Sequence, residues 1–90
     1  MVRIIEPAYI FSSPGEHLCG LAFDGQWLWH SDGAMMEIYQ IEIPTGRVVK
    51  TLDCPGIRTG LAYDGQHLCQ IVDSPNQLRF IDPATGATMR

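Results

Sequence analysis

The side chains that could bind a ligand lie in or beside four short segments, residues 12–18, 31–37, 54–59 and 73–77. Each segment separates runs of apolar residues and carries carboxylate, imidazole, guanidinium or amide groups, which recognise anions, metal ions and polar small molecules. The candidates are Glu16, His17, His30, Asp32, Glu37, Arg58, Asp73 and Asn76.

His17 and Arg58 each come shortly before a run that reads as a strand, and we align them with one another. Three copies of His17 around a threefold axis would resemble a zinc site with one open position. A ring of Arg58 side chains could hold a phosphate or a carboxylate. The competing interpretations are a surface or capping histidine and a solvated arginine. Since the local spacing requires no ligand, we predict no metal site.

Sequence motifs of catalysis are absent. The chain has no HExxH, no serine in a nucleophile elbow and no glycine-rich phosphate loop. Cys19, Cys54 and Cys69 are odd in number and widely spaced, so they predict neither a disulfide framework nor a CxxC motif. We interpret them as small buried side chains or surface thiols, and no cofactor is identified.

Trp27 and Trp29 lie on one predicted strand and can be interpreted in two ways. Two aromatic rings on one face could stack against a sugar, whereas large rings between packed sheets form a core. We favour the core. Met35 and Met36 are likewise interpreted as a loop that covers neighbouring structure, rather than as an adaptable apolar contact site.

An internal repeat organises the elements that position these residues. The run GLAFDGQWL at residues 20–28 returns forty residues later as GLAYDGQHL at 60–68, and ten of the thirty-one aligned positions are identical. A repeat of about forty residues without 3.6-residue periodicity is typical of four-stranded propeller blades.

Each copy reads as short strands separated by turns rich in Gly, Pro and Asp. Asp24-Gly25 and Asp64-Gly65 predict two-residue type I′ hairpins, and we interpret both aspartates as turn residues. The expected strands are 21–23, 27–31, 38–43 and 48–52 in the first copy, and 61–63, 67–72, 78–81 and a fourth that starts at 87 in the second.

Bulky residues on both faces of the central strands indicate sheets that are covered on both sides, as in stacked blades. We therefore predict an all-β chain of two four-stranded antiparallel blades. Residues 1–19 form an N-terminal strand and loop, 20–59 the first blade and 60–90 the second.

These repeats resemble the propeller repeats of the glutamine-cyclotransferase-like, NHL and YVTN group. The resemblance rests on GLAFDGQWLW, on the following turn with Asp32, and on IYQI with PTGRVV, and it spans nearly the whole chain. It implies the blade fold but no particular activity, since such repeats carry many unrelated functions.

Composition limits the partners of the chain. It has 90 residues, of which 46% are hydrophobic and 18% charged, and a net charge of −4. Six dispersed Lys and Arg residues provide no basic patch for nucleic acid or anionic lipid. No apolar stretch is long enough for a membrane helix or a secretory signal. We expect a cytoplasmic protein with neither nucleic-acid nor membrane partners.

Two blades are too few for a ring, because known propellers have about four to eight. We expect the chain to close a ring with copies of itself as a dimer, trimer or tetramer, and we favour a six-bladed trimer. Residues 7–12 align with the outer strand 48–53, so we expect this segment to complete the last blade of a neighbouring subunit.

The predicted function is a homo-oligomeric propeller that serves as a binding or scaffold module, with a small-molecule ligand near the ring axis. Two alternatives remain at this point. One is a metal-dependent enzyme of lactonase or glutaminyl cyclotransferase type. The other is a sugar-binding propeller, which is favoured if an aromatic residue such as Trp29 is exposed. The chain could also be a fragment of a longer propeller.

Overall fold

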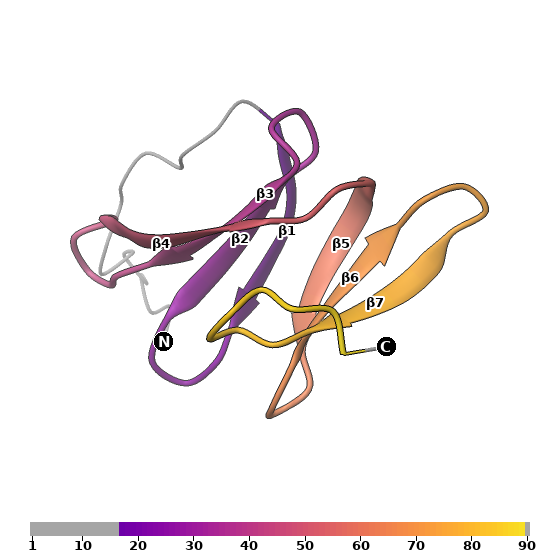
Figure 1. Ribbon diagram of the computed structural model, residues 1–90. Helices are drawn as coiled ribbons and strands as arrows, with labels where there is room; N and C mark the ends of the chain where they lie inside the picture. Colours follow the sequence, from indigo (N-terminus) through magenta and orange to yellow (C-terminus); the bar gives the residue numbers. More distant parts are fainter. Residues whose placement is uncertain (1–16, 90) are drawn as a thin grey trace, which may run out of the picture.

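The computed structural model describes residues 17–89 and contains two antiparallel sheets. The first sheet has four strands and the second three, each in the order of the chain (Figure 1). The strands are β1 (Leu18–Phe23), β2 (Leu28–Asp32), β3 (Glu37–Ile41), β4 (Val48–Asp53), β5 (Ile57–Tyr63), β6 (Leu68–Val72) and β7 (Gln77–Ile81).

The two sheets are copies of one another, as the repeat predicts. Leu28 of β2 pairs with Ile41 of β3, and forty residues later Leu68 of β6 pairs with Ile81 of β7. Within each sheet, consecutive strands pair with one another through a short turn, which gives a simple meander. The prediction of an all-β chain of antiparallel repeats is therefore confirmed.

The second sheet differs from the prediction of four strands. Thr88 forms only an isolated bridge to Ile81. This bridge occupies the position of the Ile41–Val48 pair in the first sheet, where β4 continues to Asp53. The ladder thus starts in the same register but extends over a single pair. Among the described residues, β7 therefore pairs fully with β6 but has no full partner strand along its other edge.

The predicted type I′ hairpins are wrong. Phe23 and Leu28 are separated by a loop of residues 24–27, in which Gly25 has a positive φ of 99° and Asp24 does not. Asp24 caps this loop instead, because its carboxylate accepts hydrogen bonds from the backbone N–H groups of Gln26 (2.9 Å) and Trp27 (2.6 Å). Asp64 caps the equivalent loop in the same way. In this longer loop Asp24 does not need the positive φ that a type I′ turn would require of it.

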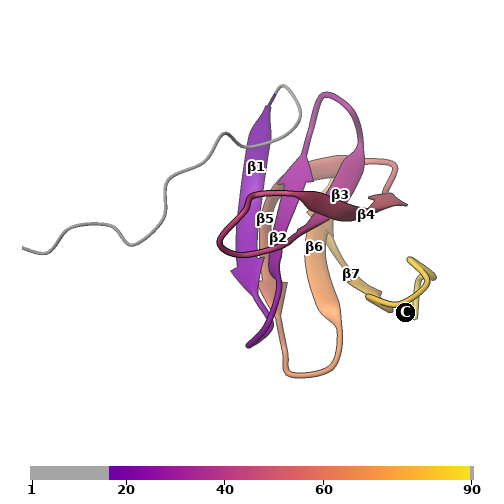
Figure 2. The same cartoon turned by 90° about the vertical axis from the view of Figure 1, so that its left-hand side faces the viewer.

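The two sheets pack face to face. Figure 2 looks from the first sheet towards the second, which lies behind it with β1 and β5 on the same side. The facing side chains form one apolar cluster, with half-buried Cys19, Ala22, Trp27, Leu61 and Tyr63 at its border. The buried members are Trp29, Ile38, Leu52, Cys54, Ile57, Leu68, Val72 and Ile81.

Gly20 allows the first strands of the two sheets to approach closely. A Cβ atom at this position would overlap the backbone nitrogen of Leu61 and lie 2.6 Å from the carbonyl carbon of Gly60. These are backbone atoms of β5, which cannot rotate away as a flexible side chain could. The seam between β1 and β5 therefore depends on the absence of a side chain at residue 20.

The expected strand exchange through residues 7–12 concerns a segment that lies outside the described residues. Within residues 17–89 the structure contains no helix that is long and apolar enough to cross a membrane.

Replacing Gly20 by alanine should destabilise the protein, because the methyl group collides with the β5 backbone. We expect a loss of about 2–3 kcal/mol in the free energy of unfolding, measured by denaturant titration. Gly65→Ala is the comparison, since Gly65 has open space around it and only a positive φ of 97° to strain, which costs about 1 kcal/mol. If Gly20→Ala proves no more harmful than Gly65→Ala, the close approach of β1 and β5 is incorrect.

Candidate functional site

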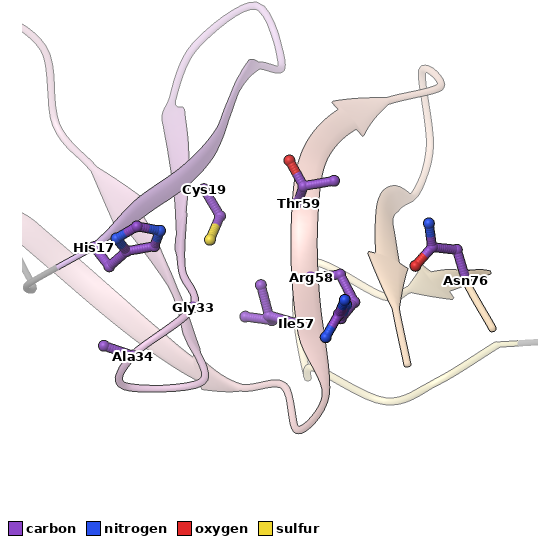
Figure 3. Close-up of a pocket in the computed structure, with 8 residues that line it drawn as sticks. All are labelled: His17, Cys19, Gly33, Ala34, Ile57, Arg58, Thr59 and Asn76. Carbon is purple, nitrogen blue, oxygen red and sulfur yellow. The ribbon is translucent and has the colours of Figure 1, made fainter. Parts of the chain in front are cut away.

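A pocket of about 520 Å³ opens at the seam between the two sheets, next to the starts of β1 and β5. In Figure 3, His17 and Ala34 lie on one side and Asn76 on the other, with three consecutive β5 residues between them. The pocket is lined by His17, Cys19, Gly33, Ala34, Ile57, Arg58, Thr59 and Asn76.

A bulge in β5 sets the orientation of the central pocket residues. Thr59 pairs with Ile71 and Leu61 with Gln70, so Gly60 is an extra residue, and it has a positive φ of 69°. The amide nitrogen of buried Gln70 donates to the carbonyl oxygens of Thr59 (3.2 Å) and Gly60 (2.7 Å). Gln70 thus supplies hydrogen bonds that the distorted ladder would otherwise lack.

The buried carboxylate of Asp32 holds the other wall of the pocket. One oxygen accepts from the backbone N–H of His17 (3.1 Å), and the other accepts from Ala34 (2.8 Å) and Met35 (2.9 Å). The N–H of Gly33 donates to the His17 carbonyl (3.1 Å). Asp32 is therefore a structural cap that joins the start of β1 to the β2–β3 turn.

The pocket lining carries a cation and no carboxylate. Arg58 is exposed, and among the described residues its guanidinium has no hydrogen-bond or ion-pair partner. The nearby acid Asp73 lies 3.8 Å from the guanidinium of Arg79, which also donates to the Pro55 carbonyl (2.7 Å). Arg79 thus partly compensates the charge of Asp73, whereas that of Arg58 is uncompensated.

Only some of the eight candidate residues from the sequence line the pocket. His17, Arg58 and Asn76 line the pocket together. Asp32 caps the pocket wall, and exposed Asp73 lies at the end of β6, near Arg79. Buried His30 lies outside the lining, and Glu16 lies outside the described residues. The eighth candidate, Glu37, accepts a hydrogen bond from the Tyr39 hydroxyl (3.0 Å).

The alignment of His17 with Arg58 is wrong. Leu18 pairs with Asp32 as Ile57 pairs with Val72, which makes Arg58 the counterpart of Cys19. The extra residue Gly60 accounts for one residue of this two-residue shift. Gly33, Ala34, Ile57 and Thr59 lie within the four segments expected from the sequence, although they were not singled out as candidates. Cys19 lies one residue beyond the first segment. The sign of a bulge that the sequence offered was Gly60, a glycine inside a predicted strand region.

Trp29 belongs to the core, and half-buried Trp27 packs against it. Trp29 is only 1% exposed, and its indole N–H donates to the Asp24 carboxylate at 2.8 Å. Partial burial raises the pKa of Asp24, but this hydrogen bond and those from the loop outweigh it and lower the pKa below its ordinary value. Trp29 therefore does not supply the exposed aromatic ring that would favour the sugar-binding alternative.

The three cysteines and the metal alternative can be placed as well. Cys54 is buried, and burial raises the pKa of its thiol, while Cys19 and Cys69 are half-buried. Over residues 17–89, no three or more His, Cys, Asp and Glu side chains come together in a way that could hold a metal ion.

His30 is a buried imidazole without a hydrogen bond. Neither ring nitrogen has a partner in the described part of the chain, and the ring packs edge-on against Tyr39 with centroids 5.5 Å apart. Burial lowers its pKa, and the Asp32 carboxylate opposes this shift only in part. In the second sheet the same position is occupied by Gln70, whose amide nitrogen donates to the carbonyl oxygens of the bulge.

The chain matches no known protein-family model, and no curated protein matches it in sequence. The pocket and the sheet faces are therefore the basis for any functional conclusion.

His30 should make the protein less stable in acid. Because its pKa is lowered by folding, the unfolded chain binds a proton first, and stability decreases as the pH falls below about 6.5. His30→Phe keeps an aromatic ring beside Tyr39 but cannot titrate, so its free energy of unfolding should fall less between neutral and mildly acidic pH. An unchanged pH slope in the variant would contradict this assignment.

Proposed function

We propose that the chain is a self-assembling propeller module, in which copies join face to face into a closed ring that presents a small-molecule site. The observation that carries the proposal is that matching positions of the two sheets differ sharply in burial. The proposed ring is a six-bladed trimer, and a tetramer of eight blades is the next alternative.

The outer face of the second sheet lacks the cover that its counterpart has. Ile38 is 0% exposed because the second sheet packs on it, whereas Leu78, forty residues later, is 61% exposed. Leu78 pairs with Ile71, and the next pair on the same face is Cys69 with Phe80. We call these four residues the Leu78 face; all are apolar, as expected of a surface that meets another sheet.

The outer face of the first sheet shows the complementary difference. Leu21 and Phe23 are each 56% exposed, whereas their counterparts Leu61 and Tyr63 are half-buried against the apolar cluster. We call the exposed pair the Phe23 face. Tyr39 and other side chains on the same side of this sheet are buried, so Leu21 and Phe23 mark the part that stays accessible.

A second copy of the chain fits both faces. Within one chain, the Trp29 and Ile38 face receives the Leu61 and Tyr63 side of the next sheet. By the same repeat, the Leu78 face of one copy would receive the Phe23 face of another. Such an interface joins different surfaces, so it forms a ring if the rotation closes. Burying each large apolar side chain contributes about 1.5–3 kcal/mol.

Charged substitutions on the two faces test this assembly. Leu78→Lys and Phe23→Glu should each abolish the parental mass, because each places a charge in the shared interface. An equimolar mixture should then form a one-to-one heterodimer, since the first variant keeps an intact Phe23 face and the second an intact Leu78 face. Light scattering gives the masses, and circular dichroism shows whether each variant is folded.

Met35→Lys is the matched control, because Met35 is a 49% exposed apolar side chain that lies in the β2–β3 turn, away from both faces. It should keep the parental mass. A parental mass for either interface variant, or a mixture in which the two do not associate, would overturn the head-to-tail interface.

A further inference from the structure

From the lining of the seam pocket, we infer that it binds a small organic acid, with the carboxylate held at Arg58 and a short apolar body between the sheets. This inference adds a ligand class to the proposed module. It does not depend on ring closure, because all eight lining residues belong to one chain.

The charge of the pocket favours an anion. The chain as a whole carries a net charge of −4, yet the lining contains Arg58 and no Asp or Glu. Asp32 next to the pocket is buried, and three backbone N–H groups donate to its carboxylate. A guanidinium with no partner among the described residues binds carboxylates through paired N–H groups. The local preference is thus opposite to the overall charge.

Further hydrogen-bond donors line the pocket besides this cation. The Thr59 hydroxyl, the Asn76 amide and the His17 imidazole all line the pocket, and each can donate a hydrogen bond to a carboxylate oxygen. Figure 3 shows Arg58 and Thr59 on β5, with Asn76 on the side of the second sheet. The pocket thus contains several hydrogen-bond donors in addition to the guanidinium.

The remaining lining is small or apolar. Ile57 is buried and belongs to the apolar cluster, and Cys19, Gly33 and Ala34 form the wall on the side of the first sheet. These residues cannot satisfy the oxygens of a phosphate or a sugar, but they can contact hydrocarbon. The volume of about 520 Å³ is within the range of small-ligand sites. An acid with an apolar body therefore fits better than an inorganic anion.

Benzoate is a suitable probe, and backbone amide NMR is a suitable readout. Titration of the full chain with benzoate should give saturable shifts at Thr59, Gly33 and Asn76. Benzamide has the same shape without the charge and should bind at least tenfold more weakly. Inorganic phosphate has the charge without the apolar body and should also bind more weakly than benzoate.

Arg58→Gln should weaken benzoate binding at least tenfold. Arg47→Gln is the matched control, because it removes the same charge from the exposed β3–β4 turn, where Arg47 pairs with Glu42 at 3.2 Å, and it should leave binding unchanged. Equal binding of benzoate and benzamide, equal effects of the two substitutions, or the absence of saturable shifts at millimolar benzoate would overturn the inference. If phosphate binds as tightly as benzoate, the inference that the ligand is an organic acid with an apolar body is wrong.

Light scattering of the same samples separates this inference from the proposed assembly. A single-chain species that binds benzoate through Arg58 would reject the ring and keep the site. A ring that does not bind benzoate would reject the organic-acid site and keep the proposed assembly.

Discussion

The contact between the two sheets is the interaction on which the rest of the structure depends. It buries Trp29, Ile38 and Leu52 of the first sheet against Leu68 and Ile81 of the second. A sheet of three or four short strands has two faces, and one of them at least must be covered before the sheet is stable in water. Each sheet covers one face of the other. The seam pocket exists only because this contact brings the start of β5 beside the start of β1.

The same contact explains why the outer faces are informative. Since the repeat gives both sheets nearly the same pattern, the chain itself shows what each kind of face binds: the Ile38 position is buried and the Leu78 position is open. A repeat of this type propagates its own interface until something closes or caps it. The proposed self-assembly would therefore need no dedicated interface motif.

Much of this fold could be predicted from the sequence. The forty-residue repeat, the turn residues and the apolar runs predicted eight strands, and seven of these are present to within a few residues. The hairpin type was wrong, because an Asp-Gly pair suits both a two-residue turn and a longer loop that the aspartate caps. The second sheet has only a bridge at Thr88 where a fourth strand was expected, which local propensity cannot decide.

The site was less predictable than the fold. The sequence brought His17, Arg58 and Asn76 to one group of loops, but it could not show that a bulge at Gly60 shifts Arg58 into register with Cys19. That shift depends on the buried amide of Gln70, a tertiary interaction. Burial likewise turned two candidate ligands, His30 and Asp32, into structural residues.

The central claim is that exposed sheet faces join copies of this chain, and the molar mass of the unmodified protein in solution tests it most directly. The account predicts a discrete species of about three times the 10.0-kDa chain, stable on dilution, with four chains as the next alternative. A folded species of single-chain mass at the same concentrations would contradict it.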